Sequence, residues 1–338
     1  MRLPQPRGEL SDRLFRQMRG EAAGTRRPVR DAGMADAEAV LGDDDLQISL
    51  WALYEQHYRG FDDVDARAEW DPDLLRVRRD LEDTFEPTLR DITSAGIAAA
   101  ERTTDSFLDQ LTEVIENVAG PSLSGYVHRR ASEAQFAEFL VQRSIYHLKE
   151  SDPHAWAIPR LEGAAKVALA ELQYDEFGAG RADRLHSDLF ARALRGAGLD
   201  DTYGAYIDVV PAYTLASNNA MSLFGLHRRL RGASMGHLAA FEATSSLPCR
   251  HYSAGADRLG YDQAVRAYFD EHVEADAVHE HLAQTDICAT MVDQHPGLRS
   301  DVLLGAAACV QLDRVTAEHM IDAWDADEPS LLSTQQAA

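Results

Sequence analysis

The chain has 338 residues, of which 45% are hydrophobic, and it carries a formal net charge of −23. This length and apolar content suffice for one large or two small globular domains. The acidic charge argues against binding to nucleic acid and to anionic membranes, because both reward Lys and Arg.

The three cysteines, Cys249, Cys288 and Cys309, are far apart and form no CxxC motif. Their spacing disfavours a disulfide framework and a Cys-ligated zinc site, and it favours a reducing compartment. No stretch approaches the ~20 apolar residues of a membrane span, and no apolar block follows the first Arg residues as in a secretory signal. We therefore expect a cytoplasmic protein.

Helical periodicity runs through most of the chain, whereas alternating or β-branched runs are sparse. The pattern predicts an all-α protein with a bundle-like core in the C-terminal half and an extra helical layer before it. Residues 1–40 are expected to be a flexible leader with a short helix at Glu9–Met18, and residues 326–338 a frayed tail. Pro211 should kink a helix, and the segment from Pro248 to Gly260 should separate two helices. From Asp45 onward, further helices are predicted at about 71–94, 104–118, 131–148, 155–177, 183–196, 201–230, 233–246, 261–284, 298–308 and 311–325.

The most informative motif is His272-x3-Asp276-x2-His279, inside a predicted helix. At about 100° per residue, the three side chains fall within roughly 60° of one another on one stripe. The apolar residues Val265 and Tyr268 mark the same stripe upstream, so the three polar side chains should point toward the core. Burying two imidazoles and a carboxylate is costly unless something compensates them, and a metal ion would do so.

Glu242 is a second unusual acidic residue, because it is the only formal charge between Arg231 and Arg250. A helix this apolar should be buried nearly all round, and a lone carboxylate inside it needs a cation or a raised pKa. A metal ion is one candidate cation. An ion pair with Arg228 or Arg229 is the alternative.

Three further candidates are weaker by themselves. Glu176 ends a predicted helix and His186 begins the next one, on either side of a glycine-containing break. Asp175 and Glu171 compete with Glu176 on the same pattern. Glu150 precedes a turn, and a solvated surface charge is its simplest interpretation.

Taken in order, these residues resemble the heme-oxygenase-like diiron oxidases and oxygenases, whose helical bundle binds two non-heme irons instead of heme. The third core helix of that family carries a His-x3-Asp-x2-His set. A Glu on the second core helix precedes it, as do a Glu and a His on the first. The steps from 176 to 186, 242 and 272 are 10, 56 and 30 residues. They are similar to those of the N-oxygenating branch, which has an additional upstream carboxylate at the place of Glu150.

The resemblance covers residues 141–325 and implies a heme-oxygenase-like diiron domain there, with residues 41–140 as auxiliary N-terminal helices. It also implies two iron ions, O2 as co-substrate and an external electron donor. A small-molecule substrate is expected, no nucleic-acid or membrane partner is, and a homodimer is compatible with the sequence. The metal ligands implied are Glu150, Glu176, His186, Glu242, His272, Asp276 and His279, with a catalytic role for Glu150.

Mixed imidazole and carboxylate ligands suit iron or manganese better than zinc. The leading hypothesis is N-oxygenation of the amine of an amino acid or related small molecule, through a diferric-peroxide intermediate. The alternative is oxidative C–C cleavage, desaturation or decarboxylation of an amino or fatty acid. A long apolar channel would favour a fatty acid, and a buried Arg near the metals would favour a carboxylated amine; Arg143, Arg181 and Arg228 are the candidates. A metal-free helical binding protein is the third hypothesis.

Four other histidines are not included in the ligand set. His281 should point about 180° away from His272 on its helix. His147 and His154 lie near Glu150 and are expected to be packed or solvated. His237, about one helical turn from Glu242, is expected to be a core histidine with its hydrogen bonds satisfied.

Overall fold

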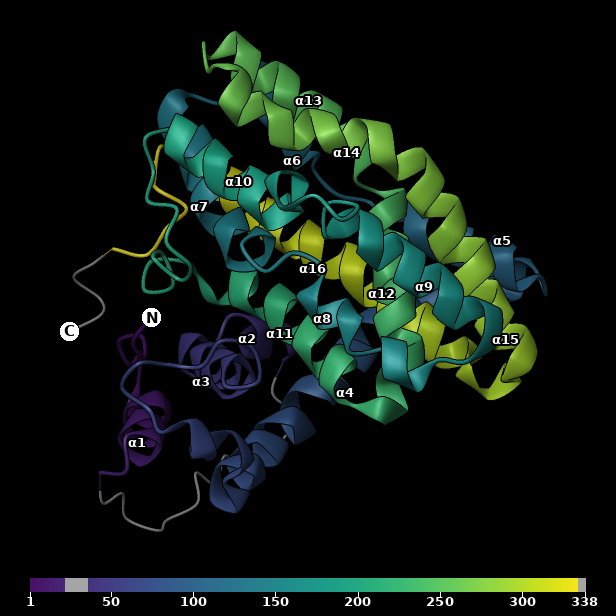
Figure 1. Cartoon of the computed structure of the whole chain (residues 1–338), viewed down its shortest axis with the longest axis horizontal. Helices are drawn as coiled ribbons and strands as arrows, with labels where there is room; N and C mark the ends of the chain where they lie inside the picture. The colour runs from purple at the N-terminus through teal and green to yellow at the C-terminus, as the bar shows by residue number, and fades with distance from the viewer. Residues whose placement is uncertain (22–35, 334–338) are drawn as a thin grey trace.

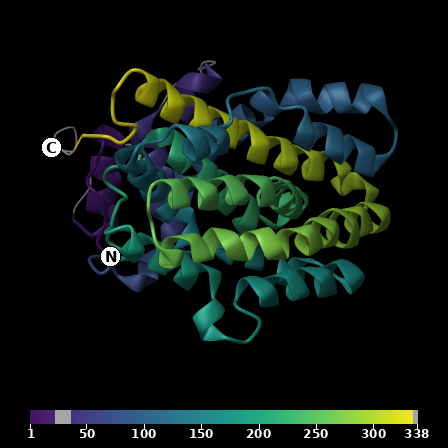
Figure 2. The same cartoon turned by 90° about the horizontal axis from the view of Figure 1, so that it is seen from above.

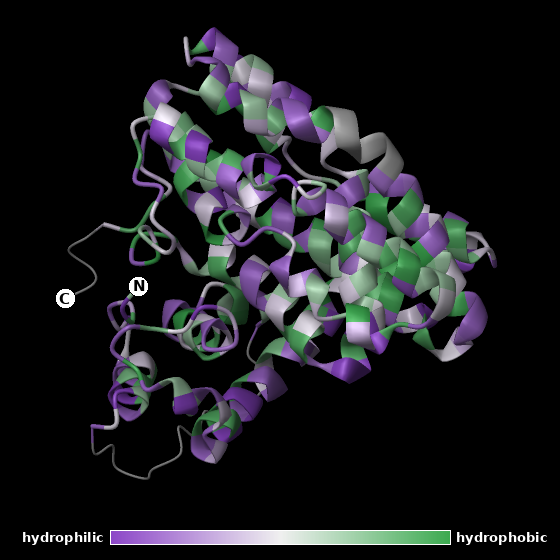
Figure 3. Ribbon diagram, in the orientation of Figure 1, coloured by the Kyte–Doolittle hydropathy of each residue, from purple (hydrophilic) through white to green (hydrophobic). Residues whose placement is uncertain are grey.

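The computed structural model describes residues 1–21 and 36–333, except for the side chains of residues 274–278. Within these ranges the secondary structure is helical and includes no strand, which confirms the predicted all-α fold. In Figure 3 the hydrophobic residues gather on the central helices and the hydrophilic residues on the outer turns. No helix in the described part of the chain combines the length and apolar character needed to cross a membrane.

An N-terminal layer consists of α1 (Glu9–Met18), α2 (Ala37–Leu41), α3 (Asp44–Glu55) and α4 (Pro72–Thr103), at the lower left of Figure 1. Helix α3 starts after Asp43, whose side chain accepts hydrogen bonds from two backbone amides of the first turn. Its residues 46–55 are buried. It packs against α1 and against α11 (Ala212–Leu226).

The first 20 residues differ from the flexible leader that the sequence suggested. Helix α1 forms where it was predicted, but it buries Leu14, Phe15 and Met18 in the same core cluster as α3. Asp45 on α3 also accepts hydrogen bonds from the backbone amides of Leu10 and Ser11. Amphipathic spacing in α1 is the physical reason, because its apolar stripe needs a partner. Residues 22–35 of the expected leader lie outside the described residues.

Helices α12 (Arg231–Ala243) and α16 (Arg299–Asp325) form the centre of the bundle, and Figure 2 shows α16 crossing it in yellow. Two glycines allow their close approach. A Cβ atom on Gly236 would lie 1.9 Å from the carbonyl oxygen of Val302, and one on Gly305 would lie 1.9 Å from that of Ala233. Any larger residue at either position would push the two helices apart.

Prolines act as helix starts in two places where the sequence suggested breaks. Pro211 does not kink a helix; it is the N-cap of α11, and residues 201–210 form turns. Pro248 lies in the first turn of α13 (Ser246–Arg258), a helix that was not predicted, because a first-turn proline loses no intrahelical hydrogen bond. The remaining α-helices are α5 (Phe107–Glu116), α6 (Leu123–Arg129), α7 (Glu133–His147), α8 (Asp152–Ala155), α9 (Gly163–Glu176), α10 (His186–Gly196), α11 (Ala212–Leu226), α14 (Gln263–His281) and α15 (Thr290–Gln294).

The chain after α16 is held in place as far as residue 333. The Ser330 hydroxyl donates to a carboxylate oxygen of Glu138 at 2.7 Å, and the backbone amide of Leu332 donates to the carbonyl of Val209 at 2.8 Å. This part of the expected frayed tail is therefore docked on the bundle. Residues 334–338 lie outside the described residues.

Candidate metal centre

The predicted ligands come from five segments of the bundle: the turn between α7 and α8, and helices α9, α10, α12 and α14. Glu150 lies in the turn between α7 and α8, and Glu242 lies near the end of α12. Glu176 is the last residue of α9, and His186 is the first residue of α10. The loop between them reverses direction through Gly178, whose φ is +83° and whose Cβ would lie 2.3 Å from a backbone oxygen. Only glycine fits that position, so the loop sequence itself sets Glu176 opposite His186.

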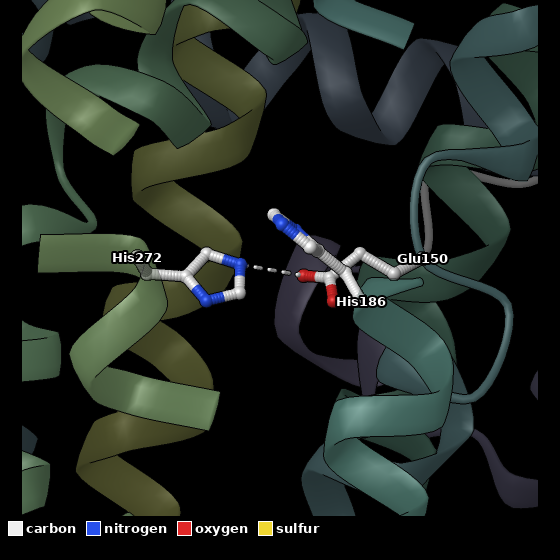
Figure 4. Close-up of side chains that lie close together, drawn as sticks. All are labelled: Glu150, His186 and His272. Carbon is white, nitrogen blue, oxygen red and sulfur yellow. Dashed lines mark ion pairs between the residues drawn. The ribbon is translucent and has the colours of Figure 1, made fainter. Parts of the chain in front are cut away.

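A first group contains Glu150, His186 and His272, all buried, with one ligand atom of each within 4.8 Å of the others. Figure 4 shows their side chains converging from α14 on one side and from α10 and the α7–α8 turn on the other. The Nε2 atom of His272 lies 3.5 Å from Oε1 of Glu150. The imidazole rings of His186 and His272 have centroids 4.6 Å apart.

A second group contains Glu176, Glu242 and His279, again all buried and within 4.8 Å of one another. The Nδ1 atom of His279 lies 3.4 Å from Oε1 of Glu176 and 3.5 Å from Oε2 of Glu242. Glu242 therefore faces a histidine. The arginine partners considered for it are exposed, and Arg229 pairs with Glu86 instead.

Glu176 connects the two groups through its two carboxylate oxygens. Oε1 faces His279 of the second group, while Oε2 lies 3.1 Å from Nδ1 of His186 in the first. A carboxylate that presents one oxygen to each of two adjacent ligand groups has the geometry of a bridging ligand. Asp175 and Glu171, which competed with Glu176 in the sequence, do not occupy this place: both belong to neither group of buried ligands.

The ring nitrogens of these groups are better suited to bind a metal ion than to interact with other protein groups alone. Nδ1 of His186, Nε2 of His272 and Nδ1 of His279 are buried and make no hydrogen bond of acceptable geometry within the described structure. Each nevertheless lies 3.1–3.5 Å from a carboxylate oxygen. Two ligands about 2.1 Å from a common ion lie about 3.0 Å apart in octahedral and about 3.4 Å apart in tetrahedral geometry. The spacing matches a first coordination sphere.

The electrostatics of the groups are those of protonated imidazoles facing carboxylates. Burial by itself lowers the pKa of both α14 histidines, but Glu150 raises the pKa of His272 to about 10. Likewise Glu242 and Glu176 raise the pKa of His279 to about 9. Burial would raise the pKa of the Glu150 carboxyl, yet His147 and His272 hold it well below its usual range. A metal ion binding here would replace protons on these imidazoles.

Tyr268 orients two of the candidate ligands. Its backbone carbonyl lies 2.8 Å from Nδ1 of His272, an arrangement that directs Nε2 of that ring toward Glu150. Its hydroxyl donates to Glu150, at 2.8 and 3.0 Å from the two carboxylate oxygens. His147 adds a third contact, with Nδ1 at 3.0 Å from Oε1 of Glu150. Beside the second group, the half-exposed Asp175 has Oδ2 3.6 Å from Nε2 of His279.

The structure thus brings together six of the seven predicted ligands. The seventh, Asp276, lies in α14, and its side chain is outside the described residues.

Glu150 is only 4% exposed, so its interpretation as a solvated surface charge is wrong. His147 is buried beside Glu150, and its spacing three residues before Glu150 was the signal that could have identified it. His154 and His237 contact each other, with Nε2 and Nδ1 3.4 Å apart.

A cavity of about 330 Å³ lies beside the first group, with Glu150, His147 and His272 on its wall. Arg143 also lines it and pairs with Asp313 at 2.9 Å. The two other candidate arginines, Arg181 and Arg228, are exposed on the surface. Aromatic side chains supply much of the remaining wall: Phe139, Tyr146, Phe190, Phe241, Tyr252, Tyr268 and Phe269.

Comparison with known proteins identifies the family of this chain. Residues 137–314 match the model of the family described as iron-containing redox enzyme. The chain belongs to this family. It is therefore an oxidoreductase of the heme-oxygenase-like class that the sequence resembled, and the metal-free binding protein is set aside.

One relative of this iron-containing redox enzyme is a nitrosourea synthase from Streptomyces achromogenes subsp. streptozoticus. The two are 25% identical over 202 residues, which make up 60% of this chain and 43% of the relative. The chain thus spans less than half the length of the curated relative it matches.

Proposed function

We propose that the protein is a non-heme diiron oxygenase that uses O2 to oxidise the amine nitrogen of an amino acid or a related small molecule. The observation that carries this proposal is the pair of buried ligand groups joined by Glu176. In this assignment Glu150, His186 and His272 would hold one iron, Glu242 and His279 would hold the other, and Glu176 would contribute to both. Asp276 completes the set, so that four carboxylates match the four positive charges of two Fe(II).

The donor set itself supports iron. Three imidazoles and four carboxylates are a mixed nitrogen and oxygen set, and the described part of the site includes no thiolate. A bound iron pair supplies the electrons that reduce O2 and leaves coordination positions open for it. The protein's part is to hold the ions, keep water away from them and orient the substrate.

The cavity beside Glu150 supports a small substrate with both a carboxylate and an amine. Phe190 and Phe241 make part of the wall apolar, while Arg143 has more guanidinium N–H groups than its bonds to Asp313 and Tyr252 use. A carboxylate held by Arg143 would leave the amine end of the molecule free to lie toward Glu150 and His272. The nitrogen chemistry named in the nitrosourea synthase relative supports the amine as the reacting group. An external electron donor belongs to the same proposal.

The direct test is to load the metal-free protein with Fe(II) without air, add candidate amines and amino acids, and then admit O2. Mass spectrometry should detect N-hydroxy, nitroso or nitro products that carry label from ¹⁸O2. Alkenes, aldehydes or CO2 from amino or fatty acids would instead favour desaturation, C–C cleavage or decarboxylation. Full N-oxygenation by a Glu150→Ala variant would remove Glu150 from the catalytic assignment.

A further inference from the structure

The turn that carries Glu150 has two buried faces. Lys149 and Glu150 are consecutive residues, and they are only 2% and 4% exposed. Glu150 points to the ligand groups, where it faces His272. Lys149 points the other way, toward the N-terminal layer, and its ammonium lies 3.1 Å from Oε2 of Glu55 at the end of α3. One peptide unit therefore separates a candidate metal ligand from a buried ion pair.

The N-terminal layer contacts this turn, or the Glu55 partner of Lys149, at several further points. The Lys149 ammonium lies 4.0 Å from the ring centroid of Tyr58, a favourable cation–π position. The Tyr203 hydroxyl donates to Glu55, 2.8 Å from each carboxylate oxygen, which leaves the acidic partner fully satisfied. Arg59 donates to the backbone carbonyl of Leu148 at 3.1 Å. These contacts join segments up to 148 residues apart in the chain.

The backbone of the turn is also constrained on its far side. Ser151 has φ +67°, in the left-handed region that a residue with a Cβ seldom adopts. Its amide donates to the Tyr146 hydroxyl at 3.2 Å, and its hydroxyl accepts from Gln173 on α9. Lys149 and Glu150 point to opposite sides of this constrained turn, so fixing Lys149 also fixes Glu150.

A buried ion pair contributes little net stability, because desolvation of the two charges offsets their attraction. Apolar residues of the same size would hold the layer to the bundle as firmly. What the Glu55–Lys149 pair adds is a defined position, since the ammonium meets the Glu55 carboxylate at 3.1 Å, whereas the nearby Asp152 carboxylate interacts with it only through its charge. This is the registration role that buried polar pairs serve elsewhere.

We propose that Glu55 and Lys149 are positioning residues, through which the N-terminal layer holds the Glu150 carboxylate in the metal centre. The inference rests on the proposed function for the metal centre itself. It assigns the N-terminal layer a role in metal binding, although none of the candidate ligands comes from it.

The test uses the full chain with the double substitution Glu55→Gln and Lys149→Met. Neither charge is left buried alone, so the variant should fold with a melting temperature near that of the original chain. In anaerobic Fe(II) titrations, one of the two irons should bind at least about tenfold more weakly, as when other residues that orient metal ligands are lost. In the metal-free protein, amide hydrogen exchange of residues 148–151 should become faster.

Glu82→Gln is the matched control, because Glu82 is another buried glutamate of the N-terminal layer, 5% exposed and bonded to Tyr54 and His227. It should change neither the iron affinities nor the exchange of the turn. Tyr203→Phe is a second variant that leaves no charge unpaired. It should move both readouts in the same direction as the double variant, by a smaller amount.

Unchanged affinity for both irons, together with unchanged exchange in the folded double variant, would overturn the inference and leave the diiron proposal intact. If the original chain itself fails to bind two irons, the proposed function is wrong. In that case faster exchange in the double variant still supports the positioning of the turn, and unchanged exchange rejects it.

Discussion

Two pairs of buried histidines lie in the same bundle and behave in opposite ways. His154 and His237 contact each other, and burial lowers the pKa of the first to about 4 and that of the second well below its usual value. His272 and His279 are equally buried, yet their pKa values are raised to about 10 and about 9. The difference is the carboxylates, which contact the second pair and not the first. Burial alone favours the neutral form of a histidine, whereas burial beside carboxylates favours a bound cation, either a proton on the imidazole or a metal ion.

The largest effect is expected from removing Glu176, the carboxylate shared by the two ligand groups. Glu176→Ala should weaken the binding of both irons at least about 100-fold and abolish product formation, because each group loses a ligand and the bridge. Equilibrium dialysis with iron analysis measures the loss. Glu171→Ala, on the exposed side of the same helix, is the matched control. Normal iron binding by a folded Glu176→Ala variant would contradict the bridging assignment.

The raised pKa values predict a steep pH dependence of iron binding. At pH 7 both His272 and His279 are protonated in the metal-free protein, so binding two irons should release about two protons from them. The overall affinity should then rise about 100-fold for each unit of pH between 6 and 8. Fe(II) titrations in buffers of different ionisation enthalpy would count the protons. An affinity that does not depend on pH would contradict displacement of imidazole protons.

The same shifts set the stability of the metal-free protein, with opposite signs for the two pairs. A histidine whose pKa is raised in the folded state stabilises the folded protein. This contribution is complete at pH values below the unfolded-state pKa of about 6.5. That stabilisation from His272 and His279 is lost as the pH rises through about 9 to 10. The lowered pKa of His154 gives stability above about 6.5 that is lost as the pH falls through about 4. Thermal melts across this range should therefore show a decline at each end.

A smaller effect is expected where a residue only orients ligands. Tyr268→Phe removes the hydroxyl that donates to Glu150 but keeps the carbonyl that accepts from His272. Iron affinity should fall about tenfold, with little change in fold. Tyr252→Phe, in the same cavity wall, is the control. Equal affinities in the two variants would show that the Tyr268 hydroxyl does not position Glu150.

The smallest effect should come from the histidine pair without carboxylates. The double variant His154→Leu and His237→Leu removes both partners of a buried contact, which should change the free energy of unfolding by no more than about 1 kcal/mol. Iron binding should be unchanged. A loss of iron in this variant would mean that the pair belongs to the metal centre, and it would remove the contrast between the two pairs.

The sequence allowed the fold class and the order of the candidate ligands to be predicted, because helical periodicity and the spacing of His272 and His279 are local signals. The choice of Glu176 over Glu171 depended on which residue ends α9, and only the resemblance favoured it. Helix α13 was missed because Pro248 looks the same in a loop and in a first helical turn.

The long-range contacts of the centre could not be predicted at all. Nothing local distinguishes Lys149 from a surface lysine, since its partner Glu55 lies 94 residues earlier in the chain. The same holds for Tyr268, whose hydroxyl meets Glu150 across 118 residues. Such contacts depend on how the helices pack, which the residue pattern of each helix leaves open.

The most direct test of the diiron centre is anomalous X-ray scattering at the iron edge from crystals loaded anaerobically with Fe(II). Two peaks about 3.5–4 Å apart are predicted, one among Glu150, His186 and His272 and the other beside Glu242 and His279, with Glu176 between them. An anomalous map without iron at these side chains, or with iron bound elsewhere in the bundle, would contradict the assignment.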